Sequence, residues 1–294
     1  MLSRFDRLLG VRFRLHPLFT IVLGLAALTG HVLEIVTMFG IVLIHELGHA
    51  AMAGWFGWRV REIRLTPFGG VAATDEDGAV PSREEAAVAL AGPAMNGLMI
   101  AFGYGMLAAG VWSYAWTMYF VQANLSLMLF NLLPVLPLDG GKLLRVGLGW
   151  LLPYYRTMRA TTYWSMLASA AMAGYALTRL GEGGLAVNLL YIGSFLMYSN
   201  WHEWKAVPFR FIRFLLGRAE RIDEWRRRGV PVEPIVVDAG ASLGYVVRLW
   251  RRERPHWVVV LEGDGRVLGV VPEERCTKHY LEKEQHRAVS ELFM

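Results

Sequence analysis

The longest uncharged stretch of this chain decides its fold class. No Asp, Glu, Lys or Arg occurs in residues 86–138, and residues 15–44 and 160–200 contain only Glu34, Arg179 and Glu182. Of the 294 residues, 54% are hydrophobic. A transmembrane helix needs about 20 apolar residues to cross the hydrocarbon core of a bilayer. The sequence therefore predicts a polytopic α-helical membrane protein, and buried helices of a large soluble domain are the minor alternative.

Six membrane spans are predicted, at residues 15–31, 33–57, 86–110, 114–134, 161–179 and 185–203. The N-terminal segment, the second-to-third and fourth-to-fifth connections and the segment after the sixth span are rich in Lys and Arg, whereas the other connections have almost none. Cytoplasmic loops carry the excess of basic residues. Both termini are therefore expected in the cytoplasm, which places an integral, multi-pass protein in the membrane.

The composition changes after the spans. Residues 205–228 are a basic, amphipathic linker, which either lies on the membrane surface or forms a connecting helix. Residues 229–294 contain short apolar runs, a helical pattern near 243–251 and a Gly-Asp-Gly turn, so we expect a small cytoplasmic α/β domain. A domain of this size is marginal alone, which favours pairing with a copy from another chain.

The sequence HELGH, residues 45–49, interrupts a predicted span. On a helix, His45 and His49 are four residues apart and project from one face, where both can bind one Zn²⁺. Glu46 would then act as the general base for a zinc-bound water. The alternative is a set of polar side chains that form hydrogen bonds between helices. The only cysteine, Cys276, excludes a Cys-based zinc site and an internal disulfide.

A third ligand is expected at the end of the long uncharged stretch, in NLLPVLPLDGGK (131–142). Asp139 is the first charged residue there, and the prolines before it prevent a regular helix. Irregular backbone at membrane depth is tolerated where it is buried in protein or lines a cavity. Asp139 is therefore the predicted third zinc ligand, and a loop aspartate that caps a helix is the alternative.

HELGH, NLLPVLPLDGG and AGPAMNG (91–97) together resemble the site-2 protease family of intramembrane metalloproteases. The resemblance implies that His45, His49 and Asp139 hold zinc and that Glu46 activates water. Six spans followed by a domain similar to one CBS module resemble the sporulation branch of this family. That branch cleaves a sigma-factor precursor in the outer forespore membrane, under the control of inhibitory membrane partners.

Residues 59–76 read as a re-entrant β-hairpin whose open edge can accept an extended peptide, with Phe68, Gly69 and Gly70 at its tip. An interfacial loop is the alternative. Further candidates for contact with substrate are Pro137 and two amides, Asn124 and Asn131, which would grip the substrate backbone or the developing oxyanion. Asn96 is more simply a tie between spans.

The CBS resemblance implies a homo-oligomer through paired modules and ATP as a regulatory ligand, and docking of the soluble part of the substrate is the alternative role. Nucleic acid is not an expected partner. Two other functions compete with the protease. A CBS-regulated transporter or metal carrier would show repeated spans and several midplane charges, and an inactive scaffold would show damage in the HELGH or aspartate motif. The sequence shows no repeat of spans and few such charges beyond HELGH, and both motifs are intact.

Overall fold

A computed structural model describes residues 12–15, 30, 32–58, 60–66, 69–74, 80–179, 181, 184–282 and 284–293. The chain divides into two compact units. The first comprises Met1–Glu76, Arg83–Pro134 and Leu138–Leu143, and the second comprises Asp77–Ser82, Val135–Pro137 and Leu144–Met294. Most of the first predicted span, 15–31, lies outside the described residues.

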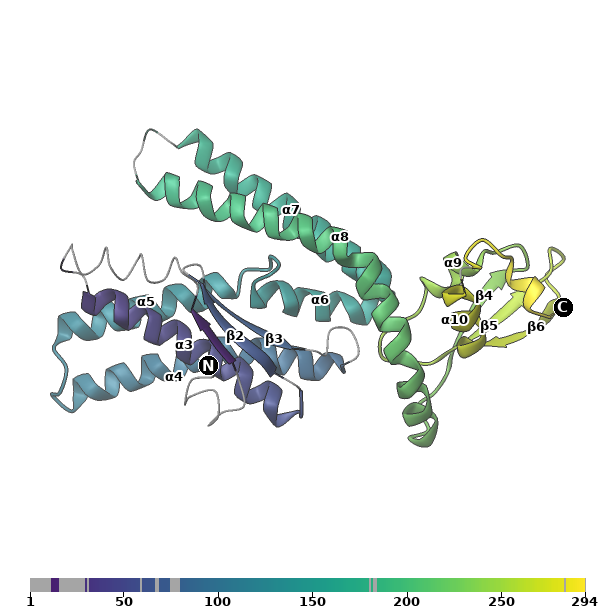
Figure 1. The fold of residues 1–294 in the computed structure, drawn as a ribbon, viewed down its shortest axis with the longest axis horizontal. Helices are drawn as coiled ribbons and strands as arrows, with labels where there is room; N and C mark the ends of the chain where they lie inside the picture. The colour runs from purple at the N-terminus through teal and green to yellow at the C-terminus, as the bar shows by residue number, and fades with distance from the viewer. Residues whose placement is uncertain are drawn as a thin grey trace. The chain divides into compact units, whose positions relative to one another are not determined.

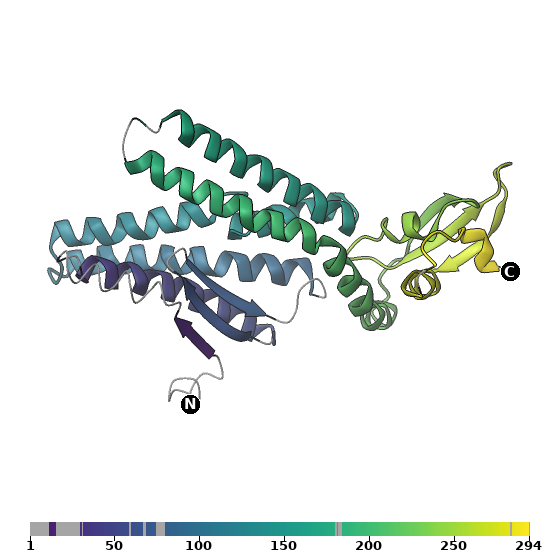
Figure 2. The ribbon, with the colours of Figure 1, turned by 45° about the horizontal axis from the view of Figure 1, so that its top comes forward.

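Three helices form the body of the first unit: α3 (Val32–Trp55), α4 (Ser82–Ala108) and α5 (Tyr114–Asn131). They lie alongside one another in Figures 1 and 2. Two described helices, α3 and α4, are long and apolar enough to cross a bilayer, at the positions of the second and third predicted spans. α5 begins where Ser113 accepts a hydrogen bond from Trp116 N, as an N-cap residue does.

A small sheet packs on α3. It consists of β1 (Arg12–Leu15), β2 (Val60–Thr66) and β3 (Gly69–Thr74), in the order β1-β2-β3. β2 and β3 pair antiparallel, as the predicted hairpin requires, whereas β1 is a strand that the sequence analysis did not predict. β1 runs parallel to β2 and occupies its outer edge. Among the described strands, the hairpin therefore has an unpaired edge along β3 only, and Phe68 lies outside the described residues.

α6 (Asp139–Leu151) begins in the first unit and continues into the second. α7 (Tyr154–Thr178) and α8 (Gly184–Arg227) pack together as a helical hairpin (Figure 1). α8 covers both the sixth predicted span and the predicted linker without interruption, although Pro208 lies inside it. The linker is therefore a connecting helix that leads directly out of the hairpin.

The C-terminal domain has the order β4 (Glu233–Asp238), α9 (Leu243–Val247), β5 (His256–Leu261), β6 (Val267–Pro272) and α10 (Glu273–Leu281), followed by the 3₁₀ helix η2 (Val289–Phe293). β5 is the central strand, parallel to β4 and antiparallel to β6. The order is therefore βαββα, which agrees with the small α/β domain expected from the sequence. Gly265 supplies the positive φ of 83° in the turn before β6.

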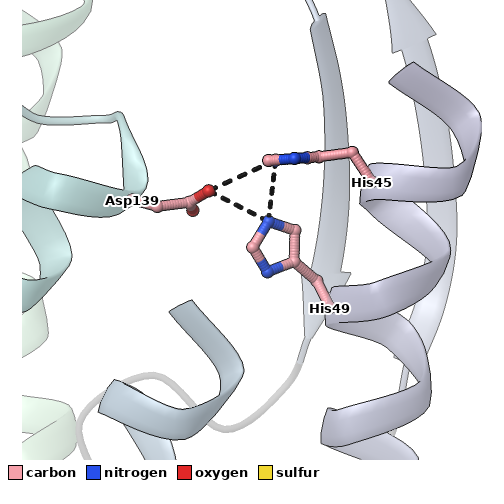
Figure 3. Close-up of side chains that lie close together, drawn as sticks. All are labelled: His45, His49 and Asp139. Atoms are coloured by element: carbon pink, nitrogen blue, oxygen red, sulfur yellow. Dashed lines mark hydrogen bonds and ion pairs between the residues drawn. The ribbon is translucent and has the colours of Figure 1, made fainter. Parts of the chain in front are cut away.

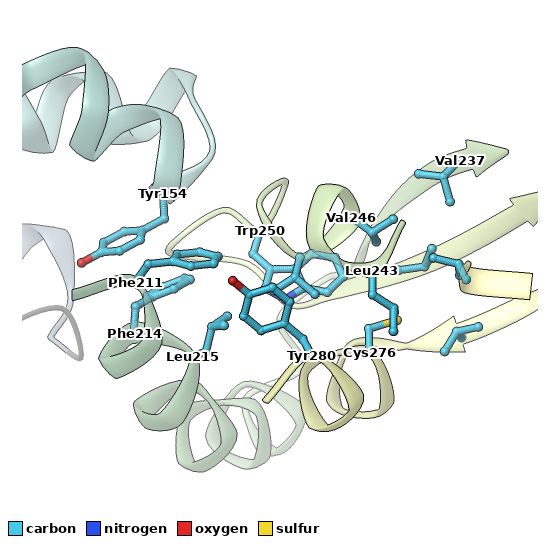
Figure 4. Close-up of a cluster of buried hydrophobic side chains, with 14 of the residues drawn as sticks. Tyr154, Phe211, Phe214, Leu215, Val237, Leu243, Val246, Trp250, Cys276 and Tyr280 are labelled. Carbon is cyan, nitrogen blue, oxygen red and sulfur yellow. The ribbon is translucent and has the colours of Figure 1, made fainter. Parts of the chain in front are cut away.

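Buried contacts join this domain to α8. Phe211, Phe214 and Leu215 on α8 belong to the same apolar cluster as Trp250 and Tyr280 of the domain (Figure 4). Burying large aromatic side chains contributes about 1.5–3 kcal/mol each. α8 and the domain thus share one hydrophobic core.

An ion pair also joins α8 to the C-terminal domain. The buried Arg218 of α8 pairs with Glu273 and donates hydrogen bonds to the carbonyl oxygens of Arg251 and Arg254. Burial lowers the pKa of Arg218 to about 9. Burial and the neighbouring guanidinium groups also lower the pKa of His256 to about 3, so His256 is neutral and accepts from Arg218 at 3.0 Å.

Candidate metal centre

Three buried side chains meet in the first unit. His45 and His49 lie one helical turn apart on α3, and Asp139 is the first residue of α6 (Figure 3). The two Nε2 atoms are 3.1 Å apart. Asp139 Oδ2 lies 3.3 Å from His45 Nε2 and 3.0 Å from His49 Nε2. The structure thus brings the three predicted ligands together.

The other ring nitrogen of each histidine faces an oxygen. His45 Nδ1 lies 2.5 Å from Asn96 Oδ1, and His49 Nδ1 lies 2.7 Å from the carbonyl oxygen of Val88. A carbonyl oxygen only accepts, so each imidazole donates from Nδ1 and keeps a lone pair on Nε2. Both lone pairs point at the space in front of Asp139.

The orientation of Asn96 follows from a chain of buried hydrogen bonds. The carbonyl oxygen of Phe120 accepts from Asn124 Nδ2 at 2.9 Å, which leaves Asn124 Oδ1 to accept from Asn96 Nδ2 at 3.0 Å. Asn96 Oδ1 is therefore the atom that faces His45. Partners of this kind fix the tautomer and the ring plane of a metal-binding histidine.

The donor atoms fit a zinc ion. Two imidazole lone pairs and a carboxylate oxygen repel one another when they converge without a proton or a cation between them, and Asp139 Oδ2 has no hydrogen-bond partner among the described residues. Ligand atoms 2.0–2.1 Å from one tetrahedral Zn²⁺ lie about 3.3 Å apart, close to the separations seen here. Two histidines and one aspartate leave the fourth position open.

Two glycines let the backbone approach this centre. A β-carbon on Gly92 of α4 would collide with His49 Nε2 and lie 2.7 Å from His45 Nε2. A β-carbon on Gly140 would collide with the carbonyl groups of Leu132 and Leu133, at the end of α5. Gly92 thus leaves room beside the histidines, and Gly140 allows α6 to begin directly against α5.

Comparisons with known proteins agree with this chemistry. The model of Peptidase family M50 matches residues 33–111 and 98–174. Stage IV sporulation protein FB of Bacillus subtilis is 32% identical over 286 residues, which cover 97% of this chain and 96% of that protein. The chain belongs to peptidase family M50. Membership in M50 makes it a metalloendopeptidase, and it gives no support to the transporter or carrier alternative.

Other M50-type proteins extend the comparison. Zinc metalloprotease MJ0392 of Methanocaldococcus jannaschii is 28% identical over 204 residues, which cover 64% of this chain and 56% of that protein. The solved structure of the site-2 protease from Methanocaldococcus jannaschii superposes with a TM-score of 0.51 at 23% identity, over 66% of this chain and 91% of that one. The mostly helical fold is therefore of the site-2 protease type.

Two further groups lie close to the three side chains of the candidate metal centre. Glu46 is buried on α3, next to His45 in the chain. Lys142 Nζ binds Asp139 Oδ1 at 2.9 Å and so leaves Oδ2 to face the histidines. Lys142 was not predicted at the site, although a lysine three residues after an aspartate on a helix indicates such a pair.

The predicted substrate-binding residues lie in several places. Asn124 is completely buried, and both ends of its amide bind the chain itself, so its observed contacts run towards Asn96. Asn131 donates to the carbonyl of Leu127 at 3.1 Å on its own helix. Gly69 and Gly70 begin β3, and Pro137 follows a cis peptide bond. Contact of these residues with substrate stays a prediction. Asn96, predicted as a tie between spans, contacts both His45 and Asn124.

Proposed function

We propose that this M50 protein is an intramembrane zinc metalloendopeptidase that hydrolyses a peptide bond of a membrane-associated protein near the cytoplasmic side. The observation that carries the proposal is the convergence of two unprotonated imidazole nitrogens and one carboxylate oxygen, all buried, with Glu46 beside them. A bound zinc ion would supply a Lewis acid that polarises the peptide carbonyl and lowers the pKa of water.

The residues of the chain have distinct roles in this reaction. His45 and His49 would hold the metal through Nε2 and Asp139 through Oδ2, while Lys142 pairs with Oδ1. Glu46 takes a proton from the attacking water onto its carboxylate and passes it to the amine nitrogen of the leaving group. The open edge of β3 would bind the substrate as an added strand, so that the scissile bond is extended and accessible.

The substrate that we propose is a sporulation sigma-factor precursor. Similarity to a stage IV sporulation protein over 97% of the chain supports this choice. The protein would lie in the outer forespore membrane with six spans and both termini in the cytoplasm. Inhibitory membrane partners would restrain it until cleavage is needed.

The C-terminal domain is proposed to be a regulatory CBS module. Its βαββα order supports this proposal, and pairing with the module of a second chain would form a homo-oligomer that binds ATP between the modules. Native mass spectrometry of the full-length protein in detergent, with and without ATP, tests both points. A strictly monomeric protein that binds no nucleotide would contradict them.

Cleavage of a co-expressed sigma-factor precursor tests the proposed function. Glu46→Gln should retain zinc and lose cleavage, and Asp139→Asn should weaken both. Asp223→Asn, which changes an exposed carboxylate on α8, should leave both unchanged. If the wild type binds zinc but leaves the precursor intact, the substrate is wrong. If it binds no zinc at all, the protease function is wrong.

A further inference from the structure

Two side chains of the α7–α8 hairpin hold one residue of the irregular segment before α6. Ser165 Oγ on α7 accepts a hydrogen bond from Leu136 N at 2.8 Å, and Asn200 Nδ2 on α8 donates to the carbonyl oxygen of Leu136 at 2.6 Å. Both side chains are completely buried. The backbone of Leu136 is therefore held by its N–H and its C=O, from two different helices.

The other buried hydroxyls of α7 behave differently. Thr161 and Thr162 donate to carbonyl groups three or four residues earlier on α7. Such bonds satisfy a hydroxyl inside a helix without reaching another segment. Among these hydroxyls, only that of Ser165 receives a hydrogen bond from the backbone of Leu136.

The amide of Asn200 is also oriented towards this segment. Nδ2 donates to the carbonyl oxygens of Leu136 and Leu196, which only accept, and lies 3.5 Å from Ser169 Oγ. Oδ1 consequently has no hydrogen-bond partner among the described residues, although it is buried. An unsatisfied buried oxygen costs free energy. The amide nevertheless keeps the orientation that binds the carbonyl oxygen of Leu136 and leaves Oδ1 unpaired among the described residues.

Leu136 is separated from the ligand Asp139 by Pro137 and Leu138 alone. Proline fixes φ, and the carbonyl of Leu138 accepts from Gly141 N and Lys142 N in the first turn of α6. A segment this short, with each residue constrained, cannot absorb a displacement of Leu136 before it reaches the carboxylate. Each residue spans at most about 3.6 Å.

We propose that Ser165 and Asn200 are positioning residues of the metal centre, which set the carboxylate of Asp139 by fixing the backbone of Leu136. The proposal rests on the proposed function, because it takes Asp139 to be a ligand. The α7–α8 hairpin would thus take an indirect part in metal binding, because neither side chain touches the metal.

Titration with Co²⁺ tests the proposal on full-length protein in detergent after removal of zinc. The affinity and the visible absorption spectrum report the strength and the symmetry of the ligand set. Ser165→Ala and Asn200→Leu should each bind Co²⁺ about 10-fold more weakly, at the lower end of the range for groups that orient ligands, and should alter the spectrum. Ser165→Thr keeps the hydroxyl and should restore both.

Thr161→Val is the matched control, because Thr161 is equally buried, lies one turn earlier on α7 and has its hydrogen bonds on its own helix. It should bind Co²⁺ as the wild type does. Equal weakening in all three variants would reveal a general loosening of the hairpin and would overturn the proposal, as would unchanged affinity and spectrum in Ser165→Ala and Asn200→Leu. A wild type without Co²⁺ binding would overturn the proposed metal centre as well.

Hydrogen–deuterium exchange of the wild type checks the same contact without a variant. The amide of Leu136 should exchange at least about 100-fold more slowly than an open amide, because its N–H is bonded and buried. Exchange at the rate of an exposed loop would contradict the proposal even if the substituted proteins failed to fold.

Discussion

Replacing Gly92 with alanine should abolish metal binding while α4 stays folded. A β-carbon at this position would lie 2.6 Å from His49 Cε1 and 2.7 Å from His45 Nε2, and still closer to His49 Nε2. Non-bonded carbon and nitrogen atoms normally stay about 3.5 Å apart, so the imidazoles must retreat by roughly 1 Å. A metal site tolerates deviations of only about 0.2 Å in its ligand distances.

The same substitution should stabilise the helix α4 rather than weaken it. Alanine favours a helix interior over glycine by about 1 kcal/mol, so Gly92→Ala should not weaken α4 itself. Gly97→Ala on the same helix is the matched control, because a β-carbon there meets nothing within 4 Å. Both changes add the same methyl group, but only one places it at the ligands.

Zinc content and affinity should separate the two variants. We expect Gly97→Ala to bind zinc as the wild type does, and Gly92→Ala to bind it at least about 100-fold more weakly, with unchanged helical circular dichroism in both. Metal analysis of the purified proteins and competition with a chromophoric chelator measure this. Full zinc occupancy in Gly92→Ala would show that the space beside α4 is not where the metal sits.

Three further changes test other contacts. Asn96→Leu removes the acceptor for His45 and should weaken zinc binding by about 10–100-fold in chelator competition; an unchanged affinity would show that the hydrogen bond does not orient the ring. Glu273→Gln leaves Arg218 buried without its counter-charge and should destabilise the C-terminal domain by about 3–5 kcal/mol, seen as faster amide exchange in residues 230–293; native-like protection would contradict it. The folded pKa of His256, about 3, lies below its ordinary value of 6.5, so the unfolded state binds more protons between these values. The stability of the domain should therefore be fully present above pH 6.5 and fall as the pH drops towards 3, and His256→Gln should flatten this dependence in thermal unfolding.

The metal ligands were predictable because their placement is local. An i, i+4 pair on a helix has one geometry, so the sequence alone puts His45 and His49 on a common face. Asp139 is recognisable in the sequence because it is the first charged residue after a long uncharged stretch. The β2–β3 hairpin and the βαββα order follow likewise from short-range alternation and turn residues.

Contacts between distant segments were not predictable in the same way. β1 has four residues and pairs with a strand far along the chain, and nothing in its local pattern specifies that partner. The drop in hydropathy after residue 204 and the presence of Pro208 indicate a boundary, yet α8 continues because Phe211 and Leu215 pack against the C-terminal domain. Tertiary packing outweighs the cost of one proline here.

The histidine side of the metal centre is held by hydrogen bonds that end on backbone carbonyls. On the histidine side, the chain from Phe120 through Asn124 and Asn96 has one direction only, because a carbonyl oxygen cannot donate. Inside a bilayer, no bulk water is present to satisfy a reversed amide. The proton of His45 is therefore confined to Nδ1 before any metal arrives, and the Nε2 lone pair is oriented by the fold rather than by the ion. A site arranged in this way spends little of its binding free energy on reorganisation when a metal binds.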